Sequence, residues 1–175
     1  MTSDIDPSSA MVEVGADSFD LFYRRQRKPL IDLAYAVSGS RTGAEDLAQE
    51  ALVAAYRSWD EVCSKDNPGT WVRRILLNRA CSAYRRTMAE ARAFARHPRE
   101  LESMAFPEVT GEIDRIWSEV RRLPRRQTQV IALSYLEHLT PTEIAEVLAI
   151  SKESVATHLR RARTTLANRL GLEES

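Results

Sequence analysis

A short stretch near the middle of the chain combines residue types that bind single-stranded nucleic acid. At helical spacing it places an indole, a carboxamide and guanidinium groups on one polar face: Trp71, Arg74, Asn78, Arg85 and Arg86. Aromatic rings stack on unstacked bases, and arginines beside them bind phosphates. From Trp71 to Arg99 there are eight arginines and a single acid, Glu90. The stretch therefore favours a nucleic-acid surface, although Trp71 alone would more often be a core or edge residue.

Two consecutive short helices are predicted between residues 139 and 170, and the second is basic. Thr140, Pro141 and Glu143 have the spacing of a capping box, and Ser151 can begin the next helix. Apolar residues three and four apart turn one side of the second helix inward: Val155, Leu159, Ala162 and Leu166. The other side carries Lys152, Ser154, Thr157, His158, Arg160, Arg161 and Arg163. This pattern is typical of a helix-turn-helix whose second helix enters the major groove.

A plain helical hairpin with a solvated charged face is the alternative interpretation of these two helices. The small Ala145, the tight turn and the basic outer face favour DNA binding over that alternative. The turn, Ala149–Ile150, lacks the glycine that often supplies a left-handed residue there. Because a Cβ atom disfavours that conformation, the sequence predicts a turn of a different shape.

The composition favours a helical protein with a folded core. The chain has 175 residues, of which 43% are hydrophobic and 29% are charged, with only 6 glycines and 7 prolines. No alternating run of β-branched and aromatic residues predicts a strand. We therefore expect an all-α fold of two small helical domains.

The sequence lacks the residue patterns that are typical of several classes of enzyme and of metal sites. The sequence has no Ser/His/Asp set and no Gly-rich phosphate loop, its histidines are scattered, and Cys63 and Cys81 form no CxxC motif. We therefore expect no catalytic residues, no cofactor, no metal site and no enzyme activity. No apolar run approaches the roughly 18 residues of a membrane helix, and the acidic N-terminus is unlike a signal peptide. The expectation is a cytoplasmic protein without membrane insertion.

The net charge of zero hides acidic and basic blocks that suggest domain boundaries. Residues 1–17 are acidic and polar and are predicted to be a disordered tail. Residues 18–87 and 112–171 are predicted to form the two domains, the second a helix-turn-helix domain. Residues 88–111, with mixed charge and no sustained apolar stripe, are predicted to be a flexible linker. Such a linker leaves the two basic faces without a fixed separation.

In the first domain, helices are predicted at 18–38 and 70–86, with a polar loop at 60–69. Between them Thr42 is predicted to cap a helix, with Glu45 completing a capping box. The first turns of that helix expose four polar residues: Glu45, Asp46, Gln49 and Glu50. Acids at this end of a helix suit its dipole. The same residues are also a surface that could receive a basic protein partner.

Three stretches in this order resemble the extracytoplasmic-function (ECF) sigma factors, the smallest type of bacterial sigma factor in the sigma-70 superfamily. GAEDLAQEAL at 43–52 resembles the region 2 helix that binds the clamp helices of the largest RNA polymerase subunit. WVRRILLNRACSAYRR at 71–86 resembles the helix that melts and reads the minus-10 promoter element. The stretch 123–166, which ends LTPTEIAEVLAISKESVATHLRRARTTL, resembles region 4, which reads the minus-35 element.

The resemblance implies an RNA polymerase sigma factor whose partners are core RNA polymerase and promoter DNA, and it makes an anti-sigma factor a candidate partner. It implies polymerase binding by Asp46, Gln49 and Glu50. It implies minus-10 binding by Trp71, Arg74, Asn78, Arg85 and Arg86, with a flipped base held by the 60–67 loop. It implies minus-35 binding by Lys152, Glu153, Ser154, Thr157, His158, Arg160 and Arg161.

A stand-alone helix-turn-helix transcriptional regulator is the alternative function. Residues 18–86 would then form a sensor or dimerisation domain. The arginine-rich helix at 71–86 discriminates between the two functions, because a sensor or dimerisation domain has no need of it.

Overall fold

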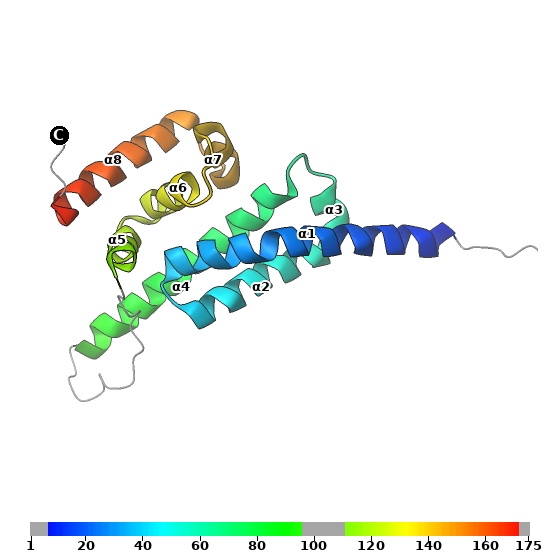
Figure 1. Ribbon diagram of the computed structural model, residues 1–175, viewed down its shortest axis with the longest axis horizontal. Coiled ribbons are helices and arrows are strands. Elements are labelled where there is room, and N and C mark those ends of the chain that lie inside the picture. Colours follow the sequence, from blue (N-terminus) through cyan, green and yellow to red (C-terminus); the bar gives the residue numbers. More distant parts are fainter. Residues whose placement is uncertain (1–6, 96–110, 172–175) are drawn as a thin grey trace, which may run out of the picture.

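The computed structural model describes the backbone of residues 7–95 and 111–171 and the side chains of residues 18–93 and 111–171. The elements of these residues are helices (Figure 1): α1 Pro7–Ser38, α2 Arg41–Arg57, α3 Trp59–Cys63, α4 Pro68–Ala95, α5 Glu112–Arg121, α6 Arg125–Tyr135, α7 Pro141–Leu148 and α8 Lys152–Leu170. The predicted all-α fold is confirmed. Within the described parts of the chain, no helix is both long enough and apolar enough to cross a membrane.

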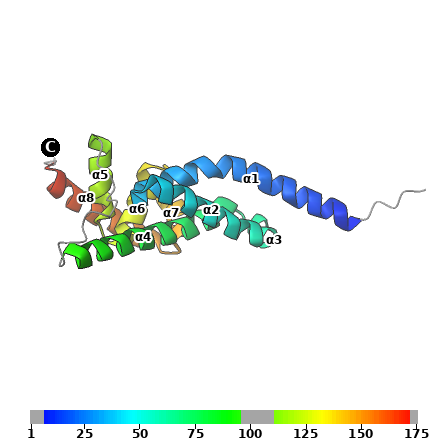
Figure 2. The same ribbon diagram turned by 90° about the horizontal axis from the view of Figure 1, so that it is seen from below.

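The first domain consists of α1, α2 and α4, which run alongside one another with the short α3 at one end (Figures 1 and 2). Leucines from each of the three long helices are almost completely buried: Leu30, Leu33, Leu52, Leu76 and Leu77. Alanines of α2 at positions 44, 48, 51 and 55 are buried against them. Because alanine is small, these positions allow the helices to approach closely, which places the outer faces of α2 and α4 in fixed orientations.

The structure extends two predicted helices beyond their expected ends. Helix α1 runs back through residues 7–17, which the sequence predicts to be a disordered tail, and Pro7 suits its first turn because proline lacks an N–H. Helix α4 continues to Ala95, into the predicted linker, because no glycine or proline interrupts the chain from Thr70 to Ala95. Residues 1–6 and 96–110 of the predicted tail and linker lie outside the described residues.

The N-cap of α2 is Ser40, so the prediction of a Thr42 cap is wrong. The Ser40 hydroxyl accepts a hydrogen bond from the Gly43 N–H at 3.1 Å. The physical reason is that Gly39, with a φ of 78°, reverses the chain after α1, and Ser40 is the next residue able to cap. As a result, Glu45 and Asp46 lie beyond the first turn of α2, where the helix dipole has little effect.

The loop predicted at 60–69 is shorter than expected because residues 59–63 form α3. Val62 and Trp59 of this short helix are buried, with exposed fractions of 0% and 8%, and their burial holds the turn against the domain. Helix α4 begins at Pro68, two residues before the predicted stretch 70–86, and the Asn67 side-chain oxygen accepts a hydrogen bond from the Thr70 N–H at 3.3 Å.

The second domain consists of α5 to α8, with α7 and α8 forming the predicted helix-turn-helix. The capping box of α7 is confirmed: Thr140 Oγ1 accepts from the Glu143 N–H at 3.3 Å, and Glu143 Oε2 accepts from the Thr140 N–H at 2.8 Å. The Thr140 N–H and the Thr140 hydroxyl both donate to Glu143 Oε2, and these two hydrogen bonds lower the pKa of the Glu143 carboxyl. Ser151 caps α8 by accepting from the Ser154 N–H at 3.1 Å. The starts of α7 and α8 are therefore both set by local hydrogen bonds.

The turn between α7 and α8 has the left-handed residue that the sequence argued against. Ala149 has φ 51° and ψ 52°, and its N–H donates to the Ala145 and Glu146 carbonyls. The Ile150 N–H donates to the Ala145 carbonyl at 3.1 Å. The prediction of a different turn shape is wrong, because satisfying the last carbonyls of α7 and burying Val147 outweigh the steric cost of the Ala149 Cβ.

Replacing Ala149 with glycine is expected to raise the free energy of unfolding by about 0.5–1 kcal/mol. Glycine removes the left-handed penalty of about 1–2 kcal/mol, and its larger unfolded-state entropy offsets part of the gain. Chemical denaturation measures the change. Ala156→Gly is the matched control, because Ala156 is exposed in the interior of α8 and its loss should cost about 1 kcal/mol. Equal destabilisation by both changes would show that Ala149 carries no strain.

The two domains contact each other directly (Figure 1). Helix α7 packs against α4, and α5 and α6 pack against α1. The buried Arg121 guanidinium donates to the Ala36 carbonyl at 2.9 Å, and the Tyr35 hydroxyl donates to Asp114 Oδ1 at 3.2 Å. The buried apolar residues of the two domains form one cluster. The prediction that the two basic faces lack a fixed arrangement therefore does not hold in this structure.

Candidate nucleic-acid interface

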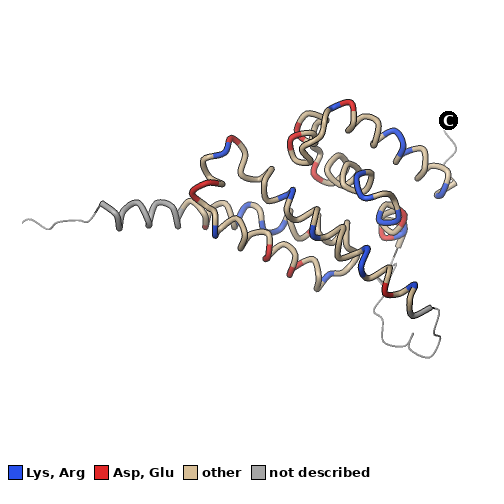
Figure 3. Tube along the Cα trace, turned by 180° about the vertical axis from the view of Figure 1, so that it is seen from behind, with Lys and Arg blue, Asp and Glu red and all other residues tan. Residues whose placement is uncertain are grey.

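Charged residues of both signs lie along helix α8 (Figure 3), and the residues predicted for the major groove differ in exposure. Lys152, Glu153, Arg160 and Arg161 are exposed, whereas Ser154, Thr157 and His158 are half-buried. The inward side is as predicted, since Val155, Leu159 and Ala162 are buried and Leu166 packs against the core. The outer side of α8 is therefore a charged ridge on a well-anchored helix.

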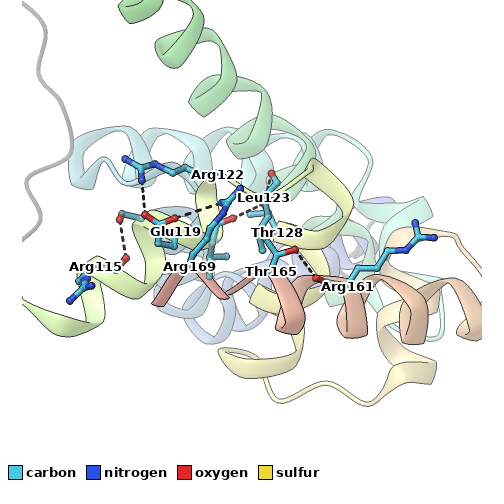
Figure 4. Close-up of polar contacts among 10 residues, drawn as sticks. Arg115, Glu119, Arg122, Leu123, Thr128, Arg161, Thr165 and Arg169 are labelled. Carbon is cyan, nitrogen blue, oxygen red and sulfur yellow. Dashed lines mark hydrogen bonds and ion pairs between the residues drawn. The ribbon is translucent and has the colours of Figure 1, made fainter. Parts of the chain in front are cut away.

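All four arginines of α8 are exposed, but two of them contact other groups of the protein. Arg163 Nε donates to the Tyr135 hydroxyl at 2.8 Å, and its guanidinium lies 5.6 Å from the centre of that ring. Arg169 lies 3.6 Å from Glu119, which also binds Arg122 at 2.5 Å, so this carboxylate ties the end of α8 to α5. Figure 4 shows the Arg161 side chain extending away from these groups. Arg160 and Arg161 thus remain available to an external ligand.

His158 lies at the buried edge of the same surface. Its Nδ1 atom is buried and has no hydrogen-bond partner in the described parts of the chain. Burial, followed by the charges of Arg161 and Arg126, lowers the pKa of the imidazole, which is therefore neutral at pH 7. A neutral, half-buried ring contributes less to phosphate binding than the neighbouring arginines do.

One face of α4 contains most of the residues predicted to bind single-stranded DNA. Trp71, Arg74, Asn78, Cys81 and Arg85 follow one another at intervals of three and four residues, and we call these five residues the α4 face. Trp71 is half-buried and packs against the core cluster, whereas Arg85 is exposed at the other end. Arg86, also exposed, lies beside the face. The helix therefore brings the predicted residues together.

Cys81 was missed as a member of this face, although its spacing signals it. It is only 4% exposed, whereas Cys63 is exposed, and both are free thiols. Burial raises the pKa of Cys81 to about 11, partly opposed by Arg125, Arg85 and Arg126 and by a hydrogen bond to Gln129. A residue at the centre of a surface predicted to bind DNA is therefore covered in this structure.

Two residues of the α4 face bind the second domain. Arg74 Nε donates to the Val147 carbonyl at 2.7 Å, and Arg74 Nη2 donates to the Glu146 carbonyl at 2.6 Å. Asn78 Oδ1 accepts hydrogen bonds from Arg125 Nη2 and from Gln129 Nε2, the latter at 3.4 Å. The polar groups that make this face suitable for DNA are thus used in contacts between the domains.

The acidic surface predicted to bind a protein partner is exposed on α2. Asp46, Gln49 and Glu50 line a shallow groove between α2 and α4 together with Val53, Ala54, Arg57 and Arg79. Glu50 forms an ion pair with Arg79 across this groove. Val53 is 40% exposed beside the acids. The surface therefore combines negative charge with an exposed apolar side chain.

A second hollow lies where α1 meets the segment between α3 and α4. It is lined by the aromatic residues Phe22 and Trp59, by Arg25 and, from the predicted 60–67 loop, by Cys63 and Asn67. The two rings are 5.0 Å apart at an angle of 45°. Because Trp59 is buried, the half-buried Phe22 ring is the aromatic surface that the hollow offers, next to a guanidinium, to a single unstacked base.

Comparison with known proteins matches the two domains separately. Residues 22–90 match the family model "Sigma-70 region 2", and residues 113–166 match "Sigma-70, region 4". The first match contains α2 and most of α4, and the second contains nearly all of α5 and the helix-turn-helix. The three predicted surfaces thus fall within the matched regions.

Curated relatives extend the similarity over nearly the whole chain. The chain is 27% identical to the ECF RNA polymerase sigma factor SigW of Bacillus subtilis, covering 89% of this chain and 88% of that protein. It is 25% identical to the ECF RNA polymerase sigma factor SigM of Mycobacterium tuberculosis, covering 97% and 85%. These alignments include both domains.

Solved structures share the fold. The sigma factor RpoE, crystallised with the anti-sigma factor NepR from Bartonella quintana, matches with a TM-score of 0.67 and 18% identity over 90% of this chain and 99% of that chain. CnrH, in complex with the cytosolic domain of CnrY, matches with a TM-score of 0.65 and 22% identity over 91% of each chain. From the two region models and the relatives together, the chain belongs to the ECF sigma factors of the sigma-70 superfamily.

Proposed function

We propose that this sigma factor directs promoter recognition through three surfaces, each on a different helix. Asp46, Gln49 and Glu50 on α2 bind core RNA polymerase. The α4 face without Cys81, together with Arg86, binds the minus-10 element. The outer side of α8 binds the minus-35 element through Lys152, Glu153, Ser154, Thr157, His158, Arg160 and Arg161. The chain acts as an initiation factor and performs no catalysis itself.

The observation that carries this proposal is that one chain contains two helices whose exposed or half-exposed residues suit nucleic acid in two different forms. The helix-turn-helix presents a charged helix with the size and polarity needed to read a major groove. The α4 face combines a tryptophan with arginines, which suits single strands rather than duplex DNA. A promoter that is duplex at one element and opened at the other requires this combination.

The hollow between α1 and α3 supports a role in holding the opened strand. Its half-buried Phe22 ring, backed by the buried Trp59, can contact a base, and Arg25 can bind an adjacent phosphate. The strand would pass from this hollow, which Pro68 and Gly69 also line, to Trp71 at the start of the α4 face. Holding an extruded base here would offset part of the few kcal/mol that unstacking costs.

The position of the acids on α2 favours polymerase binding over the alternative that they merely stabilise the helix dipole. Because α2 begins at Arg41, Asp46 lies in the second turn, beyond the reach of the helix dipole. Asp46 is exposed, so no burial requirement explains it. Glu50 is the exception, since its ion pair with Arg79 also has a structural use.

A stand-alone helix-turn-helix regulator is the competing function, and one titration separates the two. Labelled promoter DNA is titrated with the chain alone and with the holoenzyme at one fixed salt concentration, because salt controls all such affinities. We expect weak, unspecific binding by the chain alone and tight, sequence-specific binding by the holoenzyme. Tight specific binding by the chain alone would favour the stand-alone regulator instead.

A further inference from the structure

A hollow of about 1040 Å³ lies where the C-terminal part of α4 meets the second domain. Its described lining comes from α4, from the end of α5 and the connection to α6, and from the end of α8. Its volume is at the upper end of the range of pockets that hold small molecules. Of the described residues that line it, Arg85 alone belongs to the surfaces of the proposed function.

Five guanidinium groups line this hollow and give it a positive charge. They belong to Arg85, Arg92, Arg121, Arg122 and Arg169. The described lining contains a single carboxylate, that of Glu119, which already pairs with Arg122 and Arg169 (Figure 4). Arg85 and Arg92 are exposed, and neither forms an ion pair within the described residues. The hollow therefore has more positive charge than its own acid balances.

Helix dipoles explain part of this charge but not all of it. Arg92, Arg121 and Arg169 lie in the last turns of α4, α5 and α8, where a cation suits the partial negative charge of a helix end. Each helix end is equivalent to about half an elementary charge, so three ends together offset about one and a half of the positive charges. Even with the Glu119 carboxylate included, an excess of positive charge remains for an external anion.

Arg121 is the buried member of this cluster. It is 6% exposed, and its Nη1 atom donates to the neutral Ala36 carbonyl at 2.9 Å. Burial lowers the pKa of its guanidinium, and Tyr84, Tyr35 and Asp114 oppose that shift. The lowered pKa means that these surroundings disfavour the positive charge relative to water. An anion in the hollow would stabilise that charge.

The remaining lining is mostly apolar and aromatic. Met88 and the half-buried Tyr84 belong to α4, and Leu123 and Pro124 to the connection after α5. A planar base can pack against such side chains or stack on a guanidinium, whereas phosphate groups accept paired hydrogen bonds from arginines. Inorganic phosphate would use only the charged part of the hollow. A nucleotide would use both parts.

We propose that this hollow is a binding site for a nucleoside polyphosphate, with its phosphates on the arginines and its base against Tyr84 and Leu123. Because both domains contribute to the lining, the complete site requires them to be packed as in this structure. Arg85 also belongs to the proposed minus-10 set, so a bound nucleotide occupies a group that the promoter strand needs. This consequence rests on the proposed function; the site itself does not.

Isothermal titration calorimetry with the full chain tests the site. ATP and GTP are titrated separately without Mg²⁺, because a bound cation would neutralise their phosphates. We expect saturable binding of one molecule per chain by at least one of the two nucleotides. Inorganic triphosphate lacks the base and should bind at least about tenfold more weakly than that nucleotide. The matching nucleoside lacks the phosphates and should show no measurable binding.

Two variants locate the bound nucleotide by independent means. Arg92→Glu reverses the charge of an exposed lining residue and should weaken nucleotide binding by at least about tenfold. Ala89→Trp leaves the charge unchanged but fills part of the hollow, and it should weaken binding by a similar factor. Arg27→Glu and Ala156→Trp make the same changes at exposed positions outside the hollow and should alter the affinity by less than about twofold.

Three outcomes would overturn the proposal. The first is no saturable binding of either nucleotide at millimolar concentration. The second is equally tight binding of inorganic triphosphate, which would indicate a general polyanion surface. The third is a lining variant, shown to be folded by circular dichroism, that binds nucleotide as tightly as its matched control. These measurements use neither promoter DNA nor polymerase, so the site can fail while the proposed function stands.

Discussion

Holoenzyme that carries the Arg160→Glu, Arg161→Glu variant is expected to bind promoter DNA at least about 100-fold more weakly than unaltered holoenzyme. Each arginine that contacts a base is worth about 1–3 kcal/mol, and reversal of charge adds repulsion from the phosphates. The effect should be large because both side chains are exposed. Figure 4 shows the Arg161 side chain extending away from the polar contacts around Glu119. Titration of labelled duplex promoter at fixed salt measures it.

The control for charge is the variant Arg24→Glu, Lys28→Glu, which changes the net charge equally on the exposed side of α1. Those side chains are 74% and 84% exposed, and within the described residues their ion pairs are with Asp20 and Asp32 on their own helix. The single changes Arg160→Ala and Arg161→Ala add a further distinction. Loss of discrimination at one promoter position identifies a base contact, whereas uniform weakening identifies a phosphate contact. Unchanged binding by both single variants would remove this side of α8 from the interface.

Replacing Asp46 with lysine is expected to weaken association with core polymerase by about tenfold or more, which corresponds to about 1.4 kcal/mol. The fold should be unaffected, because exposed substitutions usually change stability by within about 0.5 kcal/mol. Asp46 lies beyond the first turn of α2, so loss of a dipole interaction should not mask the result. Affinity is measured with labelled core polymerase, and helical content by circular dichroism.

Asp32→Lys is the matched control for this variant. It makes the same change of charge at an exposed position of α1, outside the groove that Asp46 lines. Equal loss of affinity in the two variants would indicate a general charge effect. Loss of helical content in Asp46→Lys would assign Asp46 a structural role and contradict its assignment to the polymerase surface.

The sequence was informative where a structure depends on neighbouring residues. The Thr140 capping box, the Ser151 cap and the inward side of α8 depend on contacts within a few positions, and each is present as predicted. The same local reasoning failed at Thr42. There, the end of the preceding helix at Gly39 decided which residue could cap, and that end depends on how α1 packs.

The turn at Ala149 shows the limit of conformational preference as a guide. A penalty of about 1–2 kcal/mol disfavours alanine in the left-handed region. The carbonyls of α7 and the burial of Ile144 and Val147 outweigh it, and these contributions depend on tertiary packing. The position of Ala149 could therefore be predicted, but not its conformation.

The candidate site was predictable in its residues but not in its surroundings. Helical spacing brings Trp71, Arg74, Asn78 and Arg85 to one face of α4, and they do share it. The partners of Arg74 and Asn78 lie between 47 and 73 positions away in the sequence. Contacts at such separation depend on how two domains pack, which no spacing within one helix reveals.

The cap that Arg74 places on α7 has a consequence for genetic screens. If Arg74 holds the free chain closed and also binds the promoter strand, its loss makes opening easier and binding weaker at once. The two effects change transcription in opposite directions, so a screen that scores only promoter output would rank Arg74 as nearly neutral. Changes at Arg73 and Glu137, whose side chains lie 2.7 Å apart between α4 and the α6–α7 connection, should instead weaken the domain contact without loss of a proposed DNA contact.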